Sequence, residues 1–271
     1  MKWKIFIITH GPIIDDYYKN DPLFSNEHYQ FFNVSDIPIK HEKFKVLNKS
    51  DISDFIHLGK WYAEAEAIYN IYKCNLYQEY DYIGFIHWDF ELRSENPFID
   101  SRVTETIEKI IEQKDKFISF STFDFWKDYS QQMMIDSNFP NQLVGEGKNC
   151  YETIVKDYNQ YFDTQRTVDY LMTKRINLCS SFMCEISVFK ELMKFYCLII
   201  ESKKLDKFDV DHAYRFQGGM LERYIGCFSH HFNIAEIPLY HRWSGYIDKQ
   251  KKHRFQILKS IKKLIVSIIK T

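Results

Sequence analysis

Apolar residues along this chain follow two periods, which predict strands and helices in turn. A β-branched and aromatic run over 4–9 ends in His-Gly-Pro, as a buried strand followed by a turn does. Apolar residues recur at helical spacing over 60–74, and an apolar run over 81–92 leads directly into charged residues. The stretch 13–59 is long and polar and predicts a loop region over a ligand site, with one strand at 44–47.

The second half of the chain continues this alternation. An amphipathic helix is predicted over 103–111 and a strand over 116–123, and the stretch 124–147 has no period and predicts a loop. Further helices are predicted over 151–161, 166–173, 187–203 and 211–228, and strands over 176–184 and 234–239. Strand, helix and strand again favour an α/β sheet covered by helices, in one domain over 1–246.

The last segment differs from the rest of the chain in its charge. Residues 249–271 carry eight Lys or Arg and no acid, whereas residues 1–248 hold 28 basic and 37 acidic residues. Leu258, Ile261 and Ile265 share one face at helical spacing. The segment 247–271 is therefore predicted to be a basic amphipathic helix on an anionic membrane surface; a terminal helix packed on an acidic body is the alternative.

Composition excludes several classes of protein. A hydrophobic fraction of 45% is too high for a disordered chain, and a net charge of −1 argues against a nucleic-acid partner. The six cysteines form no C-x-x-C pair, so reduced cytosolic thiols are expected rather than a zinc ribbon. The N-terminal apolar run is too short for a signal peptide, and P-loop, nucleophile-elbow and H-E-x-x-H motifs are absent from the sequence.

Asp89 and Glu91 end the predicted strand 81–92, where open α/β sheets place ligand groups. Two carboxylates two residues apart can hold a divalent cation that bridges a diphosphate, here Mn²⁺ or Mg²⁺. This is the logic of the D-x-D motif of nucleotide-sugar glycosyltransferases, although acid-x-acid also occurs by chance among 37 carboxylates. His241 is the expected third ligand, and a structural histidine is the alternative.

Three blocks of the chain carry a resemblance. The segment 58–92 contains Asp-Tyr-Ile-Gly-Phe-Ile-His-Trp, the segment 180–189 contains Ser-Ser-Phe-Met, and the segment 215–223 reads Arg-Phe-Gln-Gly-Gly-Met-Leu-Glu-Arg. In this order they resemble the bacterial capsule and lipopolysaccharide glycosyltransferases of the galactofuranosyltransferase-like type, whose patterns are "dYIGxxHYRRYF", "xMFIMkkxxF" and "RxxGxLxERL". Where that family has His-Tyr-Arg-Arg, this chain has His-Trp-Asp-Phe at 87–90, so an acid and a ring replace two cations.

The resemblance implies a GT-A fold, with a Rossmann-like mixed sheet flanked by helices. It also implies transfer of a sugar from a nucleotide-diphosphate donor to a capsule or lipopolysaccharide glycan, with inversion. Glu222, which follows two glycines, is then expected to take the proton of the acceptor hydroxyl, with Asp89 as the other catalytic carboxylate. Asp209 and Asp211 compete for the role of base, and Glu222 is otherwise a surface residue paired with a neighbouring arginine.

The remaining expected site residues lie at strand ends and near the glycine pair. The donor-binding residues are expected to be Thr9, His10, Gly11, Lys60, Glu64, His87, Trp88 and Arg242. The acceptor-binding residues are expected to be Gly218, Gly219 and Trp243. Tryptophan faces can stack on sugars, and they also serve as ordinary core residues.

The basic tail would hold such an enzyme at the inner, cytoplasmic face of the cell membrane, where a lipid-linked acceptor resides. Two other functions are compatible with the same residues. One is a metal-dependent phosphohydrolase or nuclease that uses His87, Asp89 and Glu91. The other is a non-catalytic glycan-binding protein whose carboxylates are structural.

Overall fold

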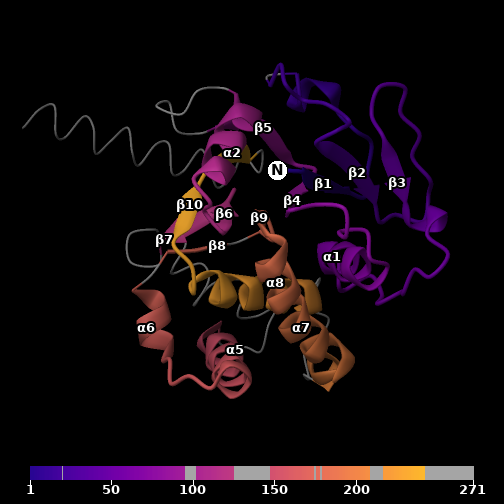
Figure 1. Cartoon of the computed structure of the whole chain (residues 1–271). Coiled ribbons are helices and arrows are strands. Elements are labelled where there is room, and N and C mark those ends of the chain that lie inside the picture. The colour runs from indigo at the N-terminus through magenta and orange to yellow at the C-terminus, as the bar shows by residue number, and fades with distance from the viewer. Residues whose placement is uncertain are drawn as a thin grey trace, which may run out of the picture.

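The computed structural model describes residues 1–19, 21–94, 102–124, 147–173, 175–177, 179–207 and 216–241. Within these ranges, one mixed sheet has the strand order β10-β6-β9-β4-β1-β2-β3 (Figure 1). Its strands are β1 (Trp3–Thr9), β2 (Tyr29–Asn33), β3 (Val46–Asn48), β4 (Tyr82–His87), β6 (Phe117–Ser119), β9 (Phe182–Glu185) and β10 (Ile234–Glu236). β9 runs antiparallel to β4 and β6, and the other neighbours are parallel.

Helices cover both faces of this sheet (Figure 1). They are α1 (Glu64–Lys73), α2 (Val103–Glu112), α5 (Gly147–Phe162), α6 (Val168–Met172), α7 (Ile186–Glu201) and α8 (Phe216–Ser229). The short 3-10 helices are η1 (Asp15–Tyr17), η2 (Lys49–Asp51) and η3 (Lys204–Lys207). Two further pairs of strands are antiparallel: β5 (Phe90–Ser94) pairs with β11 (Leu239–His241), and β7 (Thr122–Asp124) pairs with β8 (Arg175–Asn177).

β1 is an internal strand that pairs with β4 and β2, and every one of its residues is buried. Phe6 and Ile8 pack with α1, α5, α7 and α8, whereas Ile5 and Ile7 pack with α2 and β5 on the other face. An apolar run without alternation is what a strand covered on both faces requires. Gly84 of β4 lies beside Ile5, where an added Cβ would stand 2.9 Å from the Ile5 side chain.

The predicted loop 13–59 contains an internal strand of the sheet, β2, which corrects that expectation. Its residues pair with β1 from Tyr29 to Asn33 and are almost entirely buried. Polar residues flank β2 on both sides, so its run of apolar residues is too short to predict a strand. β2 is a strand because it pairs with β1. The loop before it is anchored by buried Asp21, whose Oδ2 accepts from the backbone N–H and the hydroxyl of Thr104 at 2.7 Å.

Several predicted strands are each two strands in the structure. The run 81–92 turns at Trp88 and Asp89 between β4 and β5, and the runs 116–123 and 234–239 also divide. The run 176–184 breaks because Cys179 and Ser180 have positive φ angles of 59° and 46°. Neither is a glycine, so sequence carries no turn signal there.

Residues 125–146 of the predicted loop and all of 247–271 lie outside the described residues. Within the described ranges, no helix combines the length and the apolar character needed to cross a membrane. The predicted helices 103–111, 151–161 and 187–203 are confirmed as α2, α5 and α7. The helix predicted over 60–74 is present as α1 but begins only at Glu64, because Ala63 has a positive φ angle.

Candidate active site

The candidate site lies at the carboxyl ends of β1 and β4, where the strand order reverses. From β1 the chain continues to β2 and β3 on one side, whereas β4 lies on the other side of β1. Open α/β sheets bind ligands outside such a switch point. His10 follows β1 and Trp88 follows β4, and their rings meet edge to face with centroids 5.3 Å apart. The structure therefore brings two of the predicted donor-binding residues together.

His87 lies between two carboxylates at this edge. Its Nε2 is 3.4 Å from Glu64 Oε1 and its Nδ1 is 3.6 Å from Asp89 Oδ1, and the three side chains are 10–16% exposed. Burial disfavours the charged imidazolium, but Glu64 and Asp89 outweigh it and raise the pKa of His87 to about 10. At neutral pH the site therefore holds a protonated histidine between two acids.

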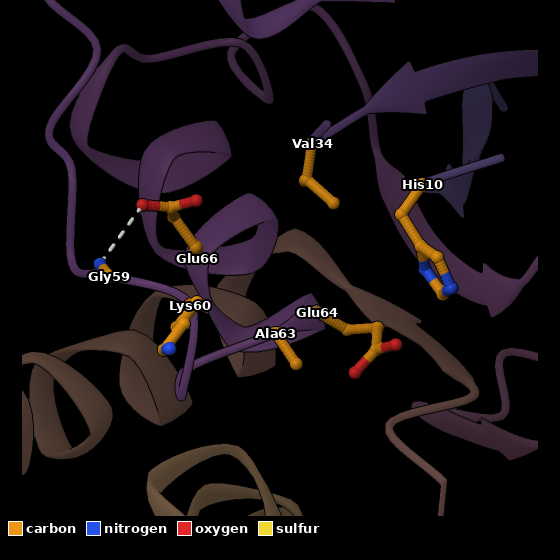
Figure 2. A pocket seen from close by; sticks show the side chains of 7 residues that line it. All are labelled: His10, Val34, Gly59, Lys60, Ala63, Glu64 and Glu66. Carbon is orange, nitrogen blue, oxygen red and sulfur yellow. Dashed lines mark hydrogen bonds between the residues drawn. The ribbon is translucent and has the colours of Figure 1, made fainter. Parts of the chain in front are cut away.

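The loop before α1 forms one wall of a cavity beside this cluster. Glu66 Oε1 accepts the backbone N–H of Leu58 at 2.7 Å and that of Gly59 at 3.4 Å (Figure 2). Gly59 has a φ of 104°, and Ala63 has a φ of 49° despite its side chain. Backbone held in such a sparsely populated region costs free energy and is often found at ligand sites.

The cavity has a volume of about 160 Å³ and lies between this loop and the ends of β1 and β2. It is lined by His10, Val34, Gly59, Lys60, Ala63, Glu64 and Glu66. Figure 2 shows the Glu64 carboxylate pointing toward the His10 ring, with Glu66 and Gly59 on the other side of the cavity. Lys60 Nζ lies 4.4 Å from the ring centroid of Trp61. Three predicted donor-binding residues, His10, Lys60 and Glu64, thus share one cavity.

Glu222 reaches the same region from α8. Its Oε1 accepts the backbone N–H of Cys179 at 2.8 Å and so fixes the left-handed turn before β9. The hydroxyl of Ser181 donates to the Cys179 carbonyl at 2.9 Å and accepts from the His87 backbone N–H at 3.4 Å. Arg223, one of the two arginines that could pair with Glu222 in the alternative, is buried and its Nη1 donates to the Gly219 carbonyl at 2.6 Å. The other, Arg215, lies outside the described residues.

The Cys179 thiol experiences the charge of both proposed catalytic carboxylates. Burial raises the pKa of its thiol well above the usual range, and the charges of Glu222 and Asp89 raise it further. Glu222 and Asp89, more than 130 positions apart in the chain, therefore act on the same group. Cys179 and Ser181 were not predicted as site residues, and only Ser181 lies in the segment 180–189 that carries the resemblance.

The predicted metal ligands are not assembled in the described residues. Phe90 and Leu92 point into the core, so Glu91 points to the opposite face of β5, where Arg93 Nε donates to its Oε2 at 2.5 Å. Asp89 lies instead in the turn before β5, and no group of three described His, Cys, Asp or Glu side chains could hold a metal ion. The backbone of His241 pairs with Phe90, but its side chain is outside the described set.

The other predicted site residues have structural contacts or lie outside the described ranges. The Thr9 hydroxyl closes the turn with the carbonyl of Gly11 at 2.8 Å. An added Cβ on Gly218 would stand 2.8 Å from the Tyr62 carbonyl, so this glycine lets α8 approach the loop before α1. Gly219 is buried in α8. Arg242, Trp243, Asp209 and Asp211 fall outside the described residues.

The fold matches that of a solved protein described as the WbbM bifunctional glycosyltransferase in its apo form. The TM-score is 0.61 with 16% identity, over 88% of this chain and 45% of that chain. This chain therefore spans less than half of the WbbM chain. The match and the mixed sheet confirm the predicted single-domain α/β fold of GT-A type.

Two mannosyltransferase structures match less closely. Ktr4p from S. cerevisiae has a TM-score of 0.39 and 13% identity, over 89% of this chain and 70% of that chain. Core-mannan synthase A from Aspergillus fumigatus, in a Mn/GDP form, has a TM-score of 0.42 and 11% identity, over 87% of this chain and 72% of that chain. No protein-family model and no curated protein matches the chain.

Proposed function

We propose that this chain is a glycosyltransferase that moves a sugar from a nucleotide-diphosphate sugar to a capsule or lipopolysaccharide glycan, with inversion. One observation carries the proposal: Glu64, His87 and Asp89 form a buried cluster at the carboxyl ends of β1 and β4, and Glu222 holds the Cys179 turn that the Ser181 hydroxyl joins to the His87 backbone. The likeness to WbbM supports the fold, and the carboxylate cluster supports the chemistry.

The cavity of about 160 Å³ is the proposed donor site. The Glu64 carboxylate can accept hydrogen bonds from donor hydroxyls, and Lys60 can offer its ammonium group to the diphosphate. His10 and Trp88 form an aromatic edge beside it, against which a flat ring could pack. A concave site with several placed polar groups is typical of small-molecule recognition.

Glu222 is the proposed general base. The hydrogen bond from Cys179 N–H holds one of its two carboxylate oxygens in place. The carboxylate would take the proton of the acceptor hydroxyl as the acceptor oxygen bonds to the anomeric carbon. The bond from that carbon to the donor diphosphate breaks in the same step, and the diphosphate leaves with the electron pair. Protonated His87 lowers the net negative charge between Glu64 and Asp89 at this edge.

The divalent cation is a separate part of the proposal. When bound, Mn²⁺ or Mg²⁺ would neutralise charge on the leaving diphosphate. The described residues do not form the expected ligand set, since Glu91 is paired with Arg93. The proposed roles of Glu222 and His87 in the transfer therefore do not depend on a bound cation.

Thermal unfolding of the protein with nucleotide sugars tests the proposal, because a ligand that binds the native state raises the melting temperature. UDP, GDP, CMP and dTDP sugars would each be added with Mn²⁺ and with EDTA. We expect one nucleotide family to raise the melting temperature, and Glu64→Gln to reduce that shift. A shift that persists in EDTA would remove the metal from the proposal. No shift with any donor, together with hydrolysis of a plain phosphodiester, would favour the phosphohydrolase instead.

A further inference from the structure

A second cavity lies beside α6, away from the candidate active site. It has a volume of about 350 Å³ and is lined by Gln165, Arg166, Thr167 and Tyr170. Small-molecule sites commonly have volumes of about 300–1,000 Å³. Figure 1 shows α6 and α5 on the side of the molecule away from α1 and β1. A ligand in this cavity would therefore not occupy the proposed donor site.

The helix α8 separates the two cavities. The Gly218 N–H near its start donates to the Trp61 carbonyl beside the donor site, whereas His231, which contacts Arg166, follows its end. α8 has 14 residues and a helix rises about 1.5 Å per residue, so its two ends are about 20 Å apart.

Arg166 brings to the second cavity a positive charge that no described acid neutralises. Its Nη2 donates to His231 Nδ1 at 3.0 Å, and its guanidinium lies 4.5 Å from the centroid of the Tyr158 ring. Its Nη1 is buried and has no acceptor among the described residues. Within this part of the chain, the nearby acids Asp163 and Asp169 are exposed and form no ion pair with it. An arginine offers five N–H donors, so a bound anion would find donors that the fold leaves unused.

His231 does not supply the missing negative charge. Because an arginine can only donate, the contact at 3.0 Å requires His231 Nδ1 to be the acceptor and the ring to be neutral. Burial lowers the pKa of His231, and the charge of Arg166 lowers it further, which agrees with this protonation state. The pair therefore carries the full positive charge of one guanidinium.

The loop that carries Arg166 is held in place without a ligand. Asn159 of α5 accepts the Arg166 backbone N–H at 2.9 Å and donates to the Arg166 carbonyl at 2.8 Å. The Thr164 hydroxyl donates to the same Asn159 oxygen at 2.7 Å. Asp163 has a φ of 50°, in the left-handed region that few non-glycine residues adopt. A preformed loop loses less conformational freedom when a ligand binds, and this favours binding.

The other lining residues offer an aromatic face and uncharged polar groups. Tyr170 is 44% exposed, and its ring contacts that of His230 with centroids 5.1 Å apart. An exposed tyrosine ring presents an apolar surface against which the C–H face of a sugar can pack. The Thr167 hydroxyl accepts the Tyr170 N–H at 3.0 Å and can donate its own hydrogen to a ligand. Gln165 is exposed at the rim.

We propose that this second cavity binds an acidic sugar unit, with Arg166 on the oxyanion and Tyr170 against the sugar ring. The planar guanidinium fits two oxygens of a carboxylate or of a phosphate, and both groups share this chemistry. The site is separate from the proposed donor site and shares no residue with it. The proposal therefore does not rest on the proposed function.

Titration calorimetry of the full chain tests the proposal with four probes: glucuronate, glucose 6-phosphate, glucose and inorganic phosphate. The two acidic sugars distinguish a carboxylate from a phosphate, glucose lacks an oxyanion, and inorganic phosphate lacks a sugar. We expect at least one acidic sugar to bind about tenfold or more tightly than glucose and than inorganic phosphate, because a hydrogen-bonded charge adds to the contact with the ring.

Three variants locate the binding. Arg166→Gln should weaken the binding of the acidic sugar by about tenfold or more. Gln165→Glu adds a negative charge at an exposed position, so it should keep the fold, weaken the binding of the acidic sugar and leave that of glucose unchanged. Arg175→Gln is the matched control, because the Arg175 guanidinium already pairs with Glu236 at 2.6 Å, and its binding should equal that of the unaltered protein.

Weak binding of both acidic sugars, or equal binding by Gln165→Glu and Arg175→Gln, would overturn the proposal even if Arg166→Gln failed to fold. Inorganic phosphate that binds as tightly as the acidic sugars would overturn it too, since the sugar would then contribute nothing. The rise in melting temperature with a nucleotide sugar should be the same in Gln165→Glu as in the unaltered protein, and its loss would show that the two sites are not separate. No such rise in the unaltered protein would count against the proposed function and leave the acidic-sugar site standing.

Discussion

His87 is held as a cation by its neighbours. Glu64 and Asp89 lie 3.4 Å and 3.6 Å from its two ring nitrogens, and all three side chains are mostly buried. Removing one member of such a buried charged cluster leaves the others without compensation. The protonation of one residue therefore affects both the stability of the fold and the charge that a donor would meet.

The stability that His87 contributes should depend on pH in a defined direction. Its pKa is raised from 6.5 to about 10, so the contribution is fully present below pH 6.5 and is lost as pH rises through 10. We expect His87→Gln to lower the free energy of unfolding by about 3 kcal/mol at pH 6 and by much less near pH 10. Urea unfolding of both proteins at pH 6, 8 and 10 measures this. A difference independent of pH would show that His87 is not protonated.

The two proposed catalytic carboxylates can be separated from structural ones by single substitutions. Glu222→Gln keeps an amide oxygen that can accept the Cys179 N–H, so the turn should persist. We expect its kcat to fall by about 10² to 10³ with little change in melting temperature. Glu201→Gln, which alters a carboxylate paired with Lys73 on the surface, is the control and should keep full activity. Equal activity of the two variants would exclude Glu222 as the base.

At the scale of elements, the site depends on how closely α8 approaches the loop before α1. The Gly218 N–H donates to the Trp61 carbonyl at 3.0 Å, and Glu66 and Asn70 of α1 hold the loop through Leu58 and Ile56. This contact sets the distance between the helix that carries Glu222 and the helix that carries Glu64. Side-chain volume at one position therefore controls the geometry of the carboxylate cluster.

Gly218→Ala should disturb this contact. The added Cβ would stand 2.8 Å from the Tyr62 carbonyl, which is backbone and must shift. We expect a loss of stability of about 1–3 kcal/mol, measured by urea unfolding. Gly11→Ala is the matched control, because nothing lies within 4 Å of its added Cβ, and its stability should be unchanged. Equal stability of the two variants would show that α8 does not need a glycine at position 218.

At the scale of the whole molecule, charge is divided between two parts of the chain. Residues 1–248 carry 28 basic and 37 acidic residues, and residues 249–271 carry eight basic residues and no acid. We propose that the basic segment binds the anionic inner face of the cell membrane and brings the enzyme to a lipid-linked acceptor. The site residues all lie before this segment, so membrane binding and transfer should be separable.

Deletion of 249–271 tests this separation. We expect the shortened protein to lose co-sedimentation with vesicles that contain phosphatidylserine, because the basic residues supply the attraction, while transfer to a soluble acceptor continues. Binding of the full chain should also weaken at high salt, since salt screens surface charges. Vesicles of phosphatidylcholine alone are the control. Unchanged binding after the deletion would refute the anchor.

Sequence alone determined the elements whose signal is local. The helices α1, α2, α5 and α7 have amphipathic periods long enough to be recognised, and β1 contains an apolar run from Ile5 to Ile8. The strand ends His10 and Asp89 were expected to bear the chemistry, and the α/β fold of GT-A type followed from the resemblance. These features depend on neighbours within one or two turns of chain.

Tertiary structure decided what depends on distant neighbours. β2 is a strand because it pairs with β1, and the break between β8 and β9 comes from a turn of non-glycine residues that Glu222 stabilises through Cys179. The ion pair of Glu91 with Arg93 on β5 is likewise a contact that the spacing of the two acids does not predict. Sequence spacing cannot show which carboxylates meet, because that depends on packing between elements far apart in the chain.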